Sequence, residues 1–133
     1  MEFKTDYRAE RYALDAKWDD FPAAVQEHAL MCGVDLMTAL ILGSYGEQFK
    51  AGQKLAQRMG LLGDIPAVGS DKKYNLLGAA IAMGHSSNSF DIDDGHRAIC
   101  GHPGTSFVAG VLAAALEKNA AWREYLTTLT VCY

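Results

Sequence analysis

Acidic and basic side chains gather in one short segment of the chain. Residues 84–104, GHSSNSFDIDDGHRAICGHPG, hold three of the four histidines, three aspartates and one arginine, between two apolar segments. Side chains of these types move protons or bind metal ions in proteins. We therefore expect the chemistry of this chain to lie in this segment.

Calcium binding is the first chemistry to consider for the run DIDDG, which begins at Asp91. An EF-hand loop requires an oxygen ligand at its fifth position, glycine at its sixth and glutamate at its twelfth. Counted from Asp91, this chain has Gly95, His96 and His102 at these positions. The spacing does not fit a calcium loop.

A transition-metal site is a second alternative for the same segment. Asp91, Asp93, His96 and His102 offer suitable ligand types. Their order matches no recognised ligand spacing, such as the paired histidines of a zincin helix. We therefore predict that the segment holds no metal ion.

General acid and base catalysis is the third alternative. A carboxylate and an imidazole held across a small anionic substrate can move a proton next to a substrate carboxylate. The run His102-Pro103-Gly104 can begin a helix, whose free N–H groups would bind one substrate carboxylate. Arg97 could bind a second carboxylate. This pattern predicts a proton-transfer site.

Less specific roles compete with these assignments. Asp93 and Asp94 are also typical turn or capping residues. Arg97 equally fits a surface salt bridge, and His28 and His85 fit solvated or structural histidines. The residue types alone leave these alternatives open.

The composition predicts a single domain over residues 1–133. Half of the positions are apolar and 21% are charged, as in soluble globular proteins. The net charge of −4 disfavours nucleic acid and anionic lipid as partners. Three widely spaced cysteines fit reduced thiols. Without a secretory signal or an uninterrupted apolar run of membrane-spanning length, we expect a cytoplasmic protein.

Helical periodicity dominates the segments that must position the site. We expect a helix over residues 22–42 that is apolar on nearly every side from Leu30 onward and therefore buried. A second helix is expected over residues 46–59, with Ala51, Leu55 and Met59 on its apolar stripe.

The second half of the chain continues this pattern. After a loop through Gly63 and Ser70, we expect helices over residues 73–83, 103–118 and 121–133. The fold class predicted is all-α, a helical bundle of about five or six helices without a central β-sheet.

The run FDIDDGH, followed six residues after its histidine by HPG, resembles the signature of the MmgE/PrpD family. The apolar helix with Asp35 and its Leu-Gly-Ser ending is similar to the family's first core helix. Met83 stands where the family usually has asparagine, and Asn88 where many members have histidine. The resemblance implies the first, helical part of the family's architecture, without its smaller α+β domain.

The resemblance also implies a function. Members include 2-methylcitrate dehydratase, cis-aconitate decarboxylase and iminodisuccinate epimerase, which move a proton at a carbon beside a carboxylate and need no metal or other cofactor. The family's catalytic acid falls on Asp91 and its catalytic histidine on His102. Contacts with a small polycarboxylate substrate are expected from Asp94, Gly95, His96, Arg97 and Gly104.

Assembly and completeness follow from the same resemblance. Relatives pair through their helical domains, which implies a homodimer. The last apolar helix stops at Tyr133 without a cap, so we expect a truncated helical domain. Further site residues, a second histidine and lysines among them, are expected beyond Tyr133, which leaves this chain alone nearly inactive. A non-catalytic helical module that dimerises or binds a partner is the alternative.

Overall fold

The computed structural model describes residues 7–133, and the predicted mostly helical bundle is confirmed there. This range contains six α-helices, one short 3-10 helix, η1 (Trp18–Asp20), and one two-stranded sheet. The α-helices are α1 (Arg8–Asp15), α2 (Ala23–Gly43), α3 (Glu47–Arg58), α4 (Leu76–Ser87), α5 (Pro103–Lys118) and α6 (Trp122–Cys132).

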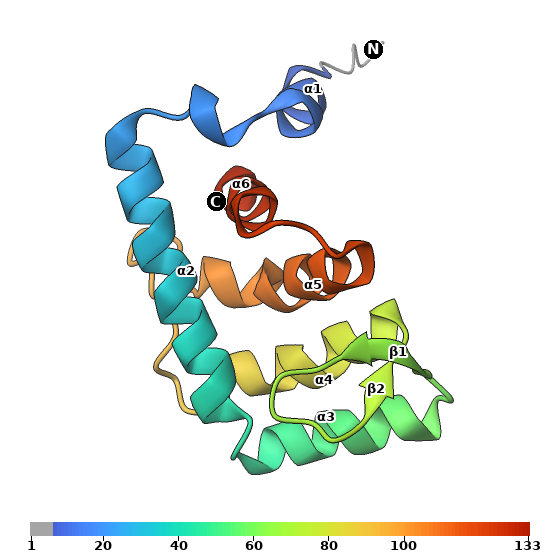
Figure 1. Cartoon of the computed structure of the whole chain (residues 1–133). Coiled ribbons are helices and arrows are strands. Elements are labelled where there is room, and N and C mark those ends of the chain that lie inside the picture. Colours follow the sequence, from blue (N-terminus) through green and yellow to red (C-terminus); the bar gives the residue numbers. More distant parts are fainter. Residues whose placement is uncertain (1–6) are drawn as a thin grey trace, which may run out of the picture.

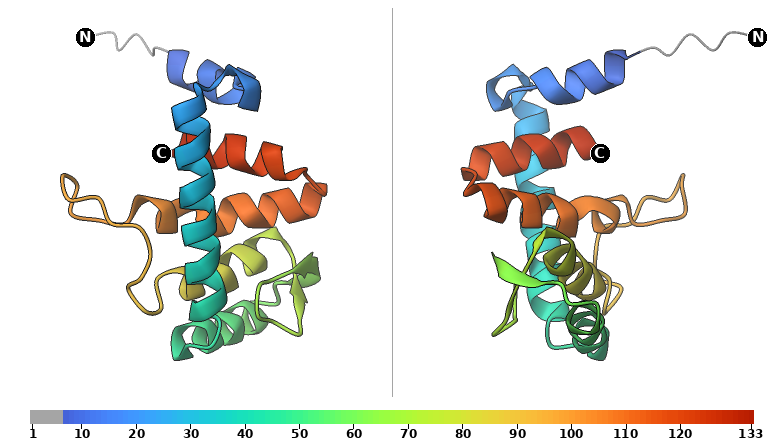
Figure 2. Two further views of the ribbon diagram at one scale, coloured as in Figure 1. Left: turned by 60° about the vertical axis from the view of Figure 1, so that its left-hand side comes forward. Right: turned by 90° about the vertical axis from the view of Figure 1, so that its right-hand side faces the viewer.

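The long helix α2 forms the spine of the fold. Helices α3, α4, α5 and α6 lie beside it one after another, from its carboxyl end toward its amino end (Figure 1). α4 packs on both α3 and α5, and α5 packs on α6. The segment between α4 and α5, residues 88–102, leaves this stack as a projecting loop (Figure 2).

The core lies where α2 crosses the stacked helices. A close backbone approach fixes one of these crossings, because a Cβ atom on Gly43 would lie 1.8 Å from the carbonyl oxygen of Ser86 in α4. Only glycine permits this contact between the two helices. The largest fully buried apolar side chains of the core are Leu36, Leu40, Phe49, Tyr74, Met83, Val108, Leu126 and Leu129.

Residues 60–74 differ from the loop and early helix start that the sequence predicts. β1 (Leu62–Pro66) pairs antiparallel with β2 (Lys73–Tyr74), and this small sheet contacts α4 and α5. α4 begins only after Asn75, whose side chain accepts a hydrogen bond from the Gly78 N–H at 2.9 Å. An N-cap of this kind ends the extended backbone and starts the helix.

The stripe predicted for α3 is the wrong face of the helix. All three of its members are exposed. The buried positions of α3 are Phe49, Gly52 and Ala56. The reason is a close approach to α4, since a Cβ atom on Gly52 would lie 2.8 Å from the side chain of His85.

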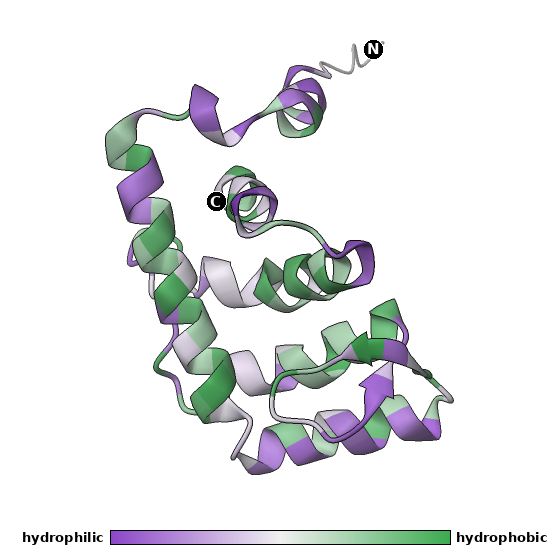
Figure 3. Cartoon of the chain, in the orientation of Figure 1, coloured by the Kyte–Doolittle hydropathy of each residue, from purple (hydrophilic) through white to green (hydrophobic). Residues whose placement is uncertain are grey.

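The prediction that α2 is buried on nearly every side is also wrong. One face packs on α4, α5 and α6, and apolar residues along α2 (Figure 3) are exposed on the other. The exposed apolar residues on α2 include Leu30, Met31, Val34 and Ile41, at 42%, 63%, 62% and 48% exposure. By length and composition α2 could cross a membrane, a test that core helices of soluble proteins also pass.

Candidate active site

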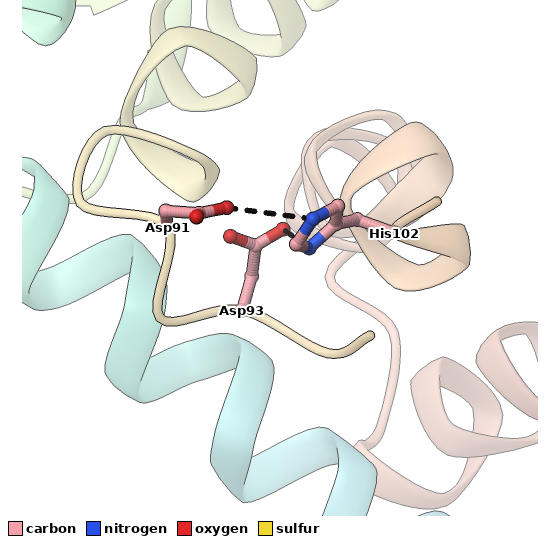
Figure 4. Close-up of side chains that lie close together, drawn as sticks. All are labelled: Asp91, Asp93 and His102. Atoms are coloured by element: carbon pink, nitrogen blue, oxygen red, sulfur yellow. Dashed lines mark ion pairs between the residues drawn. The ribbon is translucent and has the colours of Figure 1, made fainter. Parts of the chain in front are cut away.

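The centre of the candidate site is His102, which immediately precedes α5. Its Nε2 atom lies 3.4 Å from Oδ1 of Asp91, and its Nδ1 atom lies 3.0 Å from Oδ2 of Asp93 (Figure 4). A carboxylate therefore stands beside each ring nitrogen. The structure brings together the two residues that the sequence predicts as catalytic, and adds Asp93 to them.

Local backbone preferences explain how the loop presents these groups. Pro103 occupies the first helical position of α5, where its fixed φ favours the helix and its missing N–H is no loss. Asp91 has a φ of 55°, in the left-handed region that aspartate tolerates better than most residues. Its side chain is 82% exposed and that of His102 is 36% exposed. Both can be reached by a small substrate.

Asp93 is the buried member of the group, with a fully buried side chain. Its carboxylate accepts hydrogen bonds from Nδ2 of Asn88, at 3.0 and 3.1 Å to the two oxygens. The hydroxyl of Thr105 donates to Oδ2 as well. The end of α4 and the start of α5 thus hold this carboxylate together.

The N–H groups at the start of α5 are not all free, which corrects the expected substrate seat. Asp94, predicted to contact substrate, accepts the Gly104 N–H at 2.9 Å through Oδ2. The hydroxyl of Tyr133 donates to the same oxygen at 3.0 Å. The carboxylate of Asp94 therefore takes the place where the sequence puts a substrate carboxylate.

Tyr133 links this cap to α2. Burial and the hydrogen bond to Asp94 raise the pKa of the Tyr133 hydroxyl well above its ordinary value. Burial also raises the pKa of the Cys32 thiol, which hydrogen-bonds to Tyr133. Both groups are therefore neutral hydrogen-bonding partners near pH 7, and not nucleophiles.

Three of the predicted substrate-contact residues lie in the projecting part of the loop. His96, whose N–H donates to the carbonyl of Gly101 at 2.9 Å, closes a turn over Arg97. Gly95, His96 and Arg97 are exposed. In residues 7–133, the structure shows no hydrogen bond or ion pair between these side chains and Asp91 or His102. It therefore does not bring them into the same cluster.

The side chains of Asp91, Asp93 and His102 are also the ones that could hold a cation. One ligand atom from each lies within 4.8 Å of the others. The spacing in the sequence does not reveal this closeness, because the loop folds back on itself. The absence of a bound metal thus stays a prediction. One zinc or iron per purified chain in elemental analysis would contradict it.

The sequence interpretation missed the support of the site. It leaves Asp93 open between a direct role in the site and a turn or capping role, and it gives no role to Thr105 or Tyr133. Thr105 follows HPG in the first turn of a helix, where its hydroxyl can donate a hydrogen bond. This position could have indicated a buried partner for the Asp93 carboxylate. No signal in the sequence points to Tyr133, which meets Asp94 only through the packing of α6.

The fold and the site define a helical domain with a histidine and two aspartates at a helix start. The model of the MmgE/PrpD N-terminal domain matches residues 9–133. The chain therefore belongs to the MmgE/PrpD family, as the resemblance of its motif predicts. No curated protein and no solved structure matches the chain.

Proposed function

We propose that this chain carries part of the active site of a lyase or isomerase acting on a small polycarboxylic acid such as 2-methylcitrate. The reaction is removal or delivery of a proton at a carbon beside a carboxylate, by dehydration or epimerisation, without a metal ion. The observation that carries this proposal is the pair Asp91 and His102, 3.4 Å apart at the positions of the family's acid and histidine.

The two side chains suit the two halves of such a reaction. Dehydration needs a base that removes the proton and an acid that protonates the leaving hydroxyl group, and epimerisation needs proton transfer on two faces of one carbon. Asp91 and His102 are both accessible and come from opposite ends of the loop. At 3.4 Å they are too close to hold a carbon between them, so the pair must open around the substrate before one acts as base and the other as acid.

The proposed site is partial. Asp94 accepts the Gly104 N–H, so that donor is not available to substrate. The substrate's carboxylates therefore need other binding groups, such as cationic side chains. Arg97 is one that this chain offers, in a loop that would have to fold toward His102. The resemblance assigns the remaining groups, a second histidine and lysines, to sequence beyond Tyr133.

Hydrogen–deuterium exchange tests the proposal. The chain is incubated in D2O with citrate or 2-methylcitrate, and deuterium at the carbon beside the carboxylate is followed by NMR. We expect slow exchange above the buffer background, which His102→Asn should return to that background. In a full-length member of the family the corresponding change should reduce turnover by at least about a hundredfold, as for loss of a general acid or base. His28→Asn, at an exposed histidine on α2, is the matched control. Exchange unaffected by His102→Asn would contradict the proposal, and rapid turnover would contradict the partial site.

A non-catalytic role in pairing is the second candidate, and the open apolar face of α2 favours it. Met31 and Val34 are more than half exposed and border an open groove of about 610 Å³ along α2. Contiguous exposed apolar surface of this kind typically marks an interaction site. We propose that two copies of the chain pair through this face, whether or not the chain catalyses a reaction.

A further inference from the structure

Asp93 is a carboxylate that the proposed proton transfer does not use. It is fully buried, whereas Asp91 two residues earlier is 82% exposed. A buried carboxylate is found only where several groups compensate the loss of water. The groups that contact the Asp93 carboxylate therefore indicate its role.

The partners of Asp93 fix it from two helices. Asn88, at the end of α4, donates to both carboxylate oxygens, and Thr105, in the first turn of α5, donates to Oδ2. With these donors in place, the carboxylate cannot rotate away. Oδ2 is left 3.0 Å from Nδ1 of His102.

This contact bears on where His102 keeps its proton. A neutral imidazole has one N–H and one lone pair, and the partner of one nitrogen decides which is which. Both aspartates offer only acceptors, but Asp93 is fully buried and 3.0 Å from Nδ1, whereas Asp91 is 82% exposed and 3.4 Å from Nε2. The closer, buried acceptor decides the tautomer. The ring proton then belongs on Nδ1, and the lone pair on Nε2 faces Asp91.

His102 Nδ1 and Asp93 Oδ2 lie within ion-pair distance, but their geometry is not that of an aligned hydrogen bond. Hydrogen bonds at catalytic groups are often poorly aligned before substrate binds, and they tighten in the complex. A small rotation of the ring would direct the N–H at Oδ2. His102 is 36% exposed, which leaves room for that rotation.

We propose that Asp93 is a positioning residue that holds the proton of neutral His102 on Nδ1 and so presents the Nε2 lone pair beside Asp91. The inference rests on the proposed function for the use of Nε2 in a reaction. The tautomer itself is a property of the chain and can be measured without substrate. Such carboxylate–histidine pairs fix ring orientation in many active sites.

Nitrogen-15 NMR of the histidine rings tests this, in the labelled chain above the pH at which histidines titrate. The spectrum contains its own standards. Nδ1 of His85 lies 2.8 Å from the carbonyl of Ile81, which requires a proton on Nδ1, whereas the exposed His96 should show the Nε2–H form preferred in water. We expect His102 to resemble His85, and Asp93→Ala, which removes the acceptor, to move it to the Nε2–H form.

Each outcome decides the inference. His102 in the Nε2–H form in the unchanged chain would overturn it, and this spectrum suffices if Asp93→Ala does not fold. A folded Asp93→Ala chain in which His102 keeps its proton on Nδ1 would also overturn it. Asp64→Ala, at an exposed aspartate in β1 outside the site, is the matched control and should leave the proton of His102 on Nδ1. An Nδ1–H form together with no deuterium exchange would reject the proposed function and keep the positioning role.

Discussion

Asp93 and Asp94 are neighbours that tie the same loop to the same helix through different atoms. Asp93 reaches the side chains of His102 and Thr105, and Asp94 reaches the backbone N–H of Gly104. The two together place His102 relative to α5. The position of His102 therefore depends on two residues that the proposed proton transfer does not use.

Replacing Asp94 tests its capping role. Asp94→Ala leaves the Gly104 N–H and the Tyr133 hydroxyl without their acceptor, so we expect the free energy of unfolding to fall by about 1–2 kcal/mol, as for loss of an N-cap. Asp94→Asn keeps an acceptor oxygen and should lose clearly less. Urea unfolding measures both, and an equal loss in the two variants would contradict the capping interpretation.

Tyr125 gives a prediction for pH dependence. Burial raises the pKa of its hydroxyl to about 12, and that hydroxyl has no hydrogen-bond partner among residues 7–133. An unfolded tyrosine ionises near pH 10. Above about pH 10 the unfolded chain therefore binds fewer protons than the folded one. The contribution of Tyr125 to the free energy of unfolding is fully present below that pH and is lost as pH rises toward 12.

Tyr125→Phe should remove this part of the pH dependence. At pH 7 the variant should be as stable as the unchanged chain or more stable by up to about 1 kcal/mol, because an unsatisfied buried hydroxyl is lost. Chemical unfolding between pH 7 and pH 12 checks both expectations. Tyr45→Phe, at a side chain that is 78% exposed, is the control and should change neither.

Ile92 and Asp93 show how far residue types predict the site. Hydropathy places isoleucine inside and aspartate outside, yet Ile92 is 46% exposed and Asp93 is 8% exposed. Donors from Asn88 and Thr105 offset the burial of the Asp93 carboxylate. These donors come from the end of α4 and the start of α5, which are separated in the sequence by the loop. The motif predicts that Asp91 and His102 meet, but not the buried residue between them.

At the scale of elements, the ends of α5 are easier to predict than the buried face of α3. Pro103 starts α5 and Asn119, with a φ of 50°, follows its last residue, so local signals determine both ends. For α3 the same reasoning chose the wrong stripe. Its true face is set by the close approach of Gly52 to His85, a tertiary contact that no local period contains.

Two glycine substitutions separate helix contact from helix propensity. Gly43→Ala would place a methyl group 1.8 Å from the Ser86 carbonyl oxygen, so α2 and α4 must move apart. We expect a loss of stability of at least about 1–3 kcal/mol, as for overpacked cores. Gly110→Ala, in α5 with no neighbour within 4 Å of the added atom, should instead stabilise by about 0.5–1 kcal/mol.

Thermal and urea unfolding of the two glycine variants measure this contrast. Circular dichroism first establishes that each variant keeps its helical content. A Gly43→Ala chain as stable as the Gly110→Ala chain would contradict the direct backbone contact between α2 and α4. The crossing that positions the end of α4, and with it Asn88, would then need another explanation.

At the scale of the whole molecule, α2 has two different faces. The sequence correctly predicts that this helix is unusually apolar. The further prediction that the helix is buried on nearly every side is wrong. Among residues 7–133, helices cover one face only, which periodicity cannot reveal because apolar residues lie on both faces of α2. The open face is therefore the part of the fold that a single chain leaves unexplained.

Pairing through this face predicts a defined change in mass. In analytical ultracentrifugation we expect the unchanged chain to sediment as a dimer and Val34→Glu to shift it to a monomer, because a charge buried in an apolar interface lacks a partner. Val34 is 62% exposed within one chain, so the substitution should leave the helical content unchanged. Leu55→Glu, at a 43% exposed leucine on α3, is the matched control and should remain a dimer. A monomeric unchanged chain, or equal dissociation in both variants, would reject α2 as the interface.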